Sequence, residues 1–366
     1  MLTRPRVRTI VIAAVIIVLL ATSGCWSRRE MEDLAYVLIL GVEKTDSGNL
    51  KLSAQIGLPN QEPGAGGDQP AVDLLIAEGR DMSEAIDNMF LLSTKRPSLN
   101  HLRFVVVSED LAREGLGDIM DRLRREVRVR LSIRIAVTPE DIEELLKIEE
   151  PLSSQPSLAI IDQFENNAER SRMVRAEFMT LIYELLEPDR QAVLPIIESG
   201  DNRFSLGKTA IFKDDRMVAI ADKNQTFGLL LWKNEIRGGV ITMPQVGASR
   251  LVSFRIISSK TKTKVRWADD QLHVQVNVFP ELDIFELEGP LVDLKNRADH
   301  YFVNRLKDTL ELAQKEGTDF LQLAARLRRE DPQAWQAQKE NWADVLRNAQ
   351  FDLRSNTHIR GQGLVR

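Results

Sequence analysis

Two long segments of alternating residues constrain the fold of this 366-residue chain more than any other feature. They occupy residues 251–267 and 272–287, and only four residues, 268–271, join them. Successive side chains of a strand point to opposite faces of a sheet, so such alternation predicts two long strands of an antiparallel sheet. We therefore expect a sheet that is covered on one face by neighbouring elements.

The first of these segments has a basic residue at every second position: Lys260, Lys262, Lys264 and Arg266. The alternation places these four cations on one face of the strand. Solvated lysines hinder edge-to-edge aggregation of strands, which is the simpler interpretation. The alternative is a surface that binds acidic headgroups or an acidic partner.

A long amphipathic helix is expected next. Apolar residues recur at three- and four-residue spacing, and Gly317 ends a pattern made of Leu291, Leu294, Ala298, Phe302, Leu306, Leu310 and Ala313. Further helices are expected from Thr318, as N-cap, and over 333–349, with a final strand within 351–366. With a hairpin over 206–220, these elements predict a C-terminal domain, 206–366, that has long helices on an antiparallel sheet.

The N-terminal half alternates between the two kinds of element. Strands are expected at 35–42, 50–58, 103–107 and 129–137, and helices at 83–93, 111–125, 138–150, 157–167 and 173–186. The helix at 83–93 would begin at Ser83 and have Ile86, Met89, Phe90 and Leu92 as apolar residues. A Pro- and Gly-rich loop is expected at 60–70. This alternation predicts an N-terminal α/β region over 25–195.

The polar, Gly-containing segment 195–204 suggests a domain border, so a linker is expected at 196–205. The predicted fold class is therefore α/β (α+β) and multi-domain, with mixed β-sheets flanked by α-helices.

The first 24 residues have the order of a secretory signal. Three arginines within residues 4–8 precede an uncharged apolar run at 10–21, and the small residues Ser23 and Gly24 follow it. The run of twelve residues is shorter than the roughly 20 that a membrane-spanning helix needs. Residues 1–24 are therefore predicted to be a lipoprotein signal peptide.

Cys25, the only cysteine, is a candidate for lipidation. By itself it could be a buried thiol, a nucleophile, half of an intermolecular disulfide or a modified residue. Its place after two small residues is that of a bacterial lipobox, whose thiol accepts a diacylglycerol, although Thr22 stands where Leu is usual. A plain signal peptide with a free thiol is the alternative.

Two acyl chains would hold Cys25 firmly on a membrane, where one would not. Three neighbours would then lie near the headgroups, namely Trp26, Arg28 and Arg29. An ordinary linker is the alternative for these three residues.

Composition excludes several classes of function. Loss of residues 1–24 removes three of the 49 basic residues and leaves 46 against 54 acidic ones, a formal net charge of −8. Nucleic-acid binding would need a basic surface and is disfavoured. A single cysteine excludes internal disulfides, so packing must stabilise the fold.

No arrangement typical of catalysis or metal binding is present in the sequence. The four histidines, at 101, 273, 300 and 358, occur singly, and no nucleophile elbow or nucleotide-binding glycine pattern is found. The carboxylates of 138–150 fit the start of a helix, with Thr138 as N-cap and Pro139 in the first position. We predict no catalytic residue, no cofactor and no metal, and hence no enzyme.

The start of the mature chain resembles the Ger(x)C or GerAC family of spore germination lipoproteins. The matching residues are Cys25, Trp26, Arg29, Glu30, Glu32, Leu34, Ala35, Gly41 and Glu43, where the family more often has Asp at the last position. The segment 78–130 is similar to the family's Ala-rich and Arg-rich helices, and 206–222 is similar to the opening of its C-terminal region. The likeness covers nearly the whole mature chain.

This resemblance implies a non-catalytic C subunit of a spore germinant receptor with a three-domain α/β fold. Such a subunit is anchored by lipid to the outer face of the inner spore membrane and works with a multi-pass A subunit and a transporter-like B subunit. A solute-binding lipoprotein of an uptake system is the alternative, and a cell-envelope enzyme is a third possibility.

Overall fold

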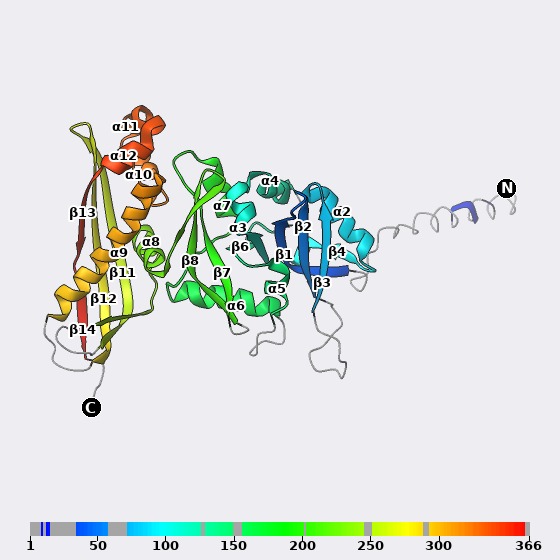
Figure 1. Cartoon of the computed structure of the whole chain (residues 1–366), viewed down its shortest axis with the longest axis horizontal. Helices are drawn as coiled ribbons and strands as arrows, with labels where there is room; N and C mark the ends of the chain where they lie inside the picture. The colour runs from blue at the N-terminus through cyan, green and yellow to red at the C-terminus, as the bar shows by residue number, and fades with distance from the viewer. Residues whose placement is uncertain are drawn as a thin grey trace, which may run out of the picture.

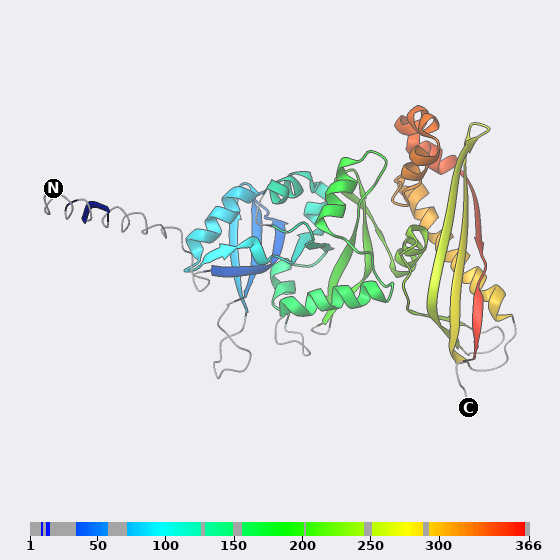
Figure 2. The same cartoon turned by 180° about the vertical axis from the view of Figure 1, so that it is seen from behind.

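The computed structural model describes residues 9, 12–14, 34–57, 72–125, 129–148, 156–200, 203–244, 251–287 and 293–362. Two β-sheets and their covering helices follow one another along the longest axis (Figures 1 and 2). The mixed α/β class is confirmed. The predicted loop at 60–70 lies outside the described residues.

Nine strands form the first sheet. They are β1 (Leu34–Lys44), β2 (Leu50–Gly57), β3 (Val72–Gly79), β4 (Arg96–Ser98), β5 (Phe104–Ser108), β6 (Arg134–Thr138), β7 (Val193–Gly200), β8 (Arg203–Lys213) and β9 (Arg216–Ala221). Around it lie α2 (Met82–Leu92), the 3₁₀ turn η2 (Leu99–His101), α3 (Glu109–Glu114), α4 (Gly117–Arg125), α5 (Ile142–Leu146), α6 (Pro156–Glu169) and α7 (Phe178–Leu186).

The order of the strands is β3-β2-β1-β5-β6-β7-β8-β9, with β4 pairing with the start of β1. The strands β1, β5, β6 and β7 run parallel, and the two ends of the sheet are antiparallel. β5 is apolar along its length because both of its faces are buried. Phe104 and Val106 pack with α5 and α6 on one face, whereas Val105 and Val107 pack with α2, α3, α4 and α7 on the other.

Residues 196–200 and 203–205 of the predicted linker belong to the strands β7 and β8. β7 and β8 form an antiparallel hairpin that pairs Val193 with Ile211 at one end and Gly200 with Arg203 at the other. Ser199 and Gly200 are exposed at the tip of this hairpin. The polar composition therefore marked a turn within the first sheet, because turns and domain borders favour the same residue types.

Five strands form the second sheet, in the order β10-β11-β12-β13 with β14 also on β12. They are β10 (Val240–Pro244), β11 (Leu251–Ala268), β12 (Gln271–Leu287), β13 (Gln350–Ser355) and β14 (His358–Gln362). The antiparallel pair β11 and β12 confirms the two long strands. Asp269 and Asp270 both have positive φ, as a two-residue hairpin turn requires.

The helices that accompany the second sheet lie mainly on one of its faces (Figure 1). They are α8 (Lys223–Lys233), α9 (Leu294–Glu316), α10 (Leu323–Glu330), α11 (Pro332–Gln338), the 3₁₀ turn η3 (Lys339–Asn341) and α12 (Trp342–Asn348). The apolar stripe of α9 is buried from Leu294 to Ala313, and Gly317 ends the helix with φ of 60°. This confirms the expected helix for its described part; Leu291 lies outside the described residues.

Several predicted helix starts are wrong by a few residues. Asp81 caps α2 in place of Ser83, and its carboxylate accepts from the backbone amides of residues 83 and 84. Thr138 ends β6, and Asp141 caps α5. The Thr318 hydroxyl donates to the carbonyl of Phe212, so it does not cap α10. In each case a carboxylate binds the amides that the local pattern assigned to a hydroxyl; at α10, the Asp319 carboxylate accepts from the amides of Leu323 and Ala324.

Two of the predicted helices are divided. Residues 111–125 form parts of α3 and α4, which are separated at Gly115. The φ of 139° at this residue is sterically accessible to glycine and disfavoured for residues with a Cβ. Residues 333–349 form α11, η3 and α12. The tail predicted as one strand forms β13 and β14, both parallel to β12.

Candidate functional site

The residues predicted for lipidation and membrane proximity are Cys25, Trp26, Arg28 and Arg29, and all four lie outside the described residues. The first described strand after them begins at Leu34. Among the described residues, no helix is both long and apolar enough to cross a membrane.

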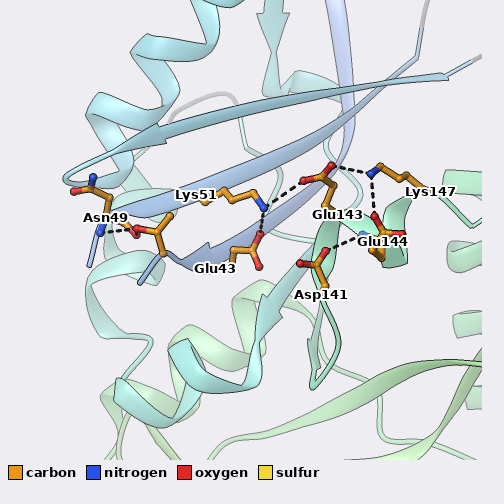
Figure 3. A network of polar contacts seen from close by, with 8 residues as sticks. Glu43, Asn49, Lys51, Asp141, Glu143, Glu144 and Lys147 are labelled. Carbon is orange, nitrogen blue, oxygen red and sulfur yellow. Dashed lines mark hydrogen bonds and ion pairs between the residues drawn. The ribbon is translucent and has the colours of Figure 1, made fainter. Parts of the chain in front are cut away.

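Two acidic residues of the segment 138–150, Glu143 and Glu144, form a network with lysines (Figure 3). Lys51 lies 3.0 Å from Glu43 and 3.4 Å from Glu143, and Lys147 contacts Glu143 at 2.8 Å and Glu144 at 3.0 Å. Hydrogen bonds from Lys147 and then Lys51 lower the pKa of Glu143. This carboxylate therefore stays ionised and is poorly suited to act as a general acid.

The histidines remain apart from one another in the fold. The ring centre of His101 lies 4.3 Å from that of Tyr36, and His273 of β12 lies opposite Arg266 of β11 in the strand pair. His300 belongs to α9 and His358 to β14. Within the described ranges, no group of three or more His, Cys, Asp or Glu residues is arranged to hold a metal ion.

A hollow of about 230 Å³ lies between the two sheets. Its polar lining includes Asn167, Arg170, Ser171, Arg172, Lys223, Asn224 and Tyr301, and no carboxylate of the described residues lines it. The Ser171 hydroxyl accepts from the amides of Arg237 at 2.8 Å and Gly238 at 3.3 Å, and the Arg172 guanidinium donates to the carbonyl of Val240 at 3.2 Å. These groups join the end of α6 to the start of the second sheet, so the hollow is a structural seam.

The cationic row on β11 is where the alternation predicted it. Lys260, Lys262, Lys264 and Arg266 are all exposed, and the residues between them are at least partly buried. Successive cations on one strand face lie about 7 Å apart and repel one another. The Lys262 ammonium lies 5.4 Å from the centre of the Phe279 ring, and in the described structure none of the four forms an ion pair. The row is therefore a candidate surface for an acidic partner.

Comparison with known proteins decides the family. A model described as the spore germination protein N-terminal domain matches residues 27–199, and one described as spore germination B3/GerAC like, C-terminal, matches residues 207–363. This chain belongs to the GerAC family of spore germination proteins. The borders of the two GerAC matches, at 199 and 207, both fall within the β7–β8 hairpin.

Individual GerAC relatives match along almost the full length of the chain. Spore germination protein KC of Bacillus subtilis (strain 168) is 26% identical over 377 residues, which cover 93% of this chain and 92% of that protein. Spore germination protein A3 of the same organism is 26% identical over 364 residues, covering 94% and 95%. The crystal structure of the GerBC protein superposes with a TM-score of 0.62 at 17% identity and covers 88% of this chain and 97% of that one. These matches confirm the resemblance seen in the sequence.

One surface feature escaped the sequence analysis, at the end of α2. The apolar residues expected in the helix at 83–93 include Met89, which is buried. Phe90, Leu91 and Leu92 are exposed instead. Three consecutive apolar residues cannot all lie on the one buried face of a helix, because neighbours are about 100° apart around its axis. The run of three apolar residues at 90–92 is therefore the sequence signal for apolar side chains exposed at this helix end.

Proposed function

We propose that this chain is the lipid-anchored C subunit of a spore germinant receptor and takes part in nutrient-triggered germination without catalysing a reaction. The observation that carries the proposal is the match of both GerAC models, in order, along residues 27–363. The names of the relatives, which include spore germination proteins KC, A3 and B3, connect them to the same process.

Attachment through Cys25 is supported by the order of residues around it. The basic start, the short apolar run and two small residues precede the cysteine, and eight residues separate it from Leu34 of β1. In the proposal, residues 1–24 are removed, the thiol carries a diacylglycerol, and Trp26, Arg28 and Arg29 lie near the headgroups. The folded part then stands on the outer face of the inner spore membrane beside the A and B subunits.

A scaffold role is supported by the pairing of the polar groups. The carboxylates of Glu143 and Glu144 are engaged by lysines, and the polar groups of the hollow join the two sheets. The exposed cations of β11 offer a surface for a partner subunit.

The decisive experiment replaces the lipidated residue. Cys25→Ala is expected to leave the chain without an acyl group, to release it from the membrane fraction and to abolish germination in response to nutrients. Ser27→Ala is the matched control, because it changes a small neighbour and retains the thiol. The intact mass of the purified protein gives the lipid directly. Membrane retention of Cys25→Ala at the wild-type level, or an unmodified Cys25 in the native protein, would contradict the anchor.

A further inference from the structure

The last turn of α2 presents an apolar surface to solvent. The helix buries Met82, Ala85 and Met89 against the first sheet. The exposed fractions of the residues that follow are 39% for Phe90, 78% for Leu91 and 62% for Leu92. Exposed clusters of large apolar residues mark sites that contact a partner or a membrane.

Two basic residues, Lys95 and Arg96, follow the end of α2 in the chain. Lys95 is half-buried and Arg96, the first residue of β4, is exposed. In the part of the chain that the structure describes, neither side chain forms an ion pair. Apolar residues beside cations match the chemistry of a bilayer surface, where acyl chains lie beneath anionic headgroups.

Strand pairing places this surface next to the point where the chain leaves its anchor. β4 lies parallel to the first residues of β1, with Arg96 opposite Leu34 and Ser98 opposite Tyr36. Paired strands are about 4.8 Å apart. Leu34 lies nine positions after Cys25, and a fully extended chain of that length spans at most about 32 Å. An acylated Cys25 therefore keeps Arg96, which follows the end of α2, within about 37 Å of the membrane.

The end of the molecule that carries α2 lies opposite the end that carries the second sheet. In both views, α2, β4 and the start of β1 lie at one extremity, and the second sheet lies at the other (Figures 1 and 2). Other exposed apolar residues, such as Leu186 of α7 with 68% of its surface exposed, are not joined to the anchor by a strand pair.

We propose that the surface formed by Phe90, Leu91, Leu92, Lys95 and Arg96, here called the α2 tip, docks on the phospholipid bilayer. The two most exposed apolar side chains, those of Leu91 and Leu92, enter the boundary between headgroups and acyl chains, and the two cations contact anionic headgroups. The proposal rests on the lipid anchor at Cys25, because the anchor brings the α2 tip to the bilayer. Docking of the α2 tip fixes the orientation of the folded part. It places the cationic row of β11 away from the lipid, where a protein partner can reach the row.

The test uses the lipidated full-length protein with a single new thiol. Leu91→Cys is labelled with an environment-sensitive dye after acylation has consumed the thiol of Cys25, and Leu186→Cys is the matched control on an equally exposed leucine. Both proteins are reconstituted into vesicles of phosphatidylcholine with phosphatidylglycerol that carry a quencher on their acyl chains. The dye at 91 is expected to shift to shorter wavelength and to lose emission, whereas the dye at 186 keeps its aqueous spectrum.

The contribution of charge is tested in the same assay. Replacing Lys95→Glu and Arg96→Glu in the Leu91→Cys protein is expected to reverse the shift on these vesicles, and thermal unfolding checks that the variant remains folded. An aqueous spectrum at 91 in a protein whose mass shows an acylated Cys25 overturns docking by the α2 tip and leaves the proposed function intact. An unmodified Cys25 instead contradicts the anchor itself, so the two failures are distinguishable.

Discussion

Gly228 of α8 lies so close to α9 that no larger side chain fits there. A Cβ at this position would lie 2.1 Å from the carbonyl oxygen of Arg305 and 2.1 Å from the hydroxyl of Thr309. Ordinary contacts of a Cβ begin near 3.4 Å, and the carbonyl belongs to the helix backbone, so it cannot swing away. Gly228→Ala would therefore force the two helices apart by about 1 Å.

The free energy of unfolding is expected to fall by about 3 kcal/mol. Overpacking of a core costs about 1–3 kcal/mol. Separation of the helices also strains the bond from the Trp232 indole to the carbonyl of Leu306, now 3.1 Å long, and an unsatisfied buried donor costs about 1–3 kcal/mol. The higher helix propensity of alanine than of glycine raises the free energy of unfolding by only about 1 kcal/mol.

Urea unfolding followed by tryptophan fluorescence measures this effect. Four of the five tryptophans belong to the C-terminal half, at 232, 267, 335 and 342, so emission reports on the second sheet and its helices. A loss of about 3 kcal/mol lowers the urea midpoint by roughly 1–2 M. Gly200→Ala is the control, because nothing lies within 4 Å of a Cβ at that exposed position. Equal midpoints for the two variants would refute the close approach of α8 and α9.

Two further predictions concern ionised side chains. Burial raises the pKa of Asp319 to about 6, so the folded protein holds this proton more tightly than the unfolded chain does. The protonated carboxyl then contributes about 3 kcal/mol to the free energy of unfolding. This contribution is fully present below about pH 4 and is lost as the pH rises through 6. Asp319→Asn should remove this slope from the pH dependence of the urea midpoint, because the amide does not titrate; an unchanged slope would contradict the burial. Arg134→Met should cost about 1–2 kcal/mol because this part-buried guanidinium joins Glu165, at 2.7 Å, to a second carboxylate. Arg80→Met, at an exposed pair, should leave the midpoint unchanged, and equal effects of the two arginine variants would count against the network.

The sequence by itself determined the elements whose pattern is long and local. The alternation over 251–287 fixed the hairpin of β11 and β12, because only a strand places every second side chain on one face. The three- and four-residue spacing up to Ala313 fixed α9 and its buried stripe for the same kind of reason. The family likeness was equally available, since it depends on the order of residues alone.

Only the tertiary structure decided features that depend on residues far apart in the chain. The polar stretch at 196–205 has the composition of a linker, and its place in the first sheet depends on the pairing of β7 with β8. The parallel pairing of β13 and β14 with β12 joins residues more than 70 positions apart. The position of Arg96 opposite Leu34, which brings the α2 tip to the anchored end, likewise comes from a strand pair across some 60 residues. Local sequence patterns determine which element forms, whereas its neighbours are selected by the packing of the whole chain.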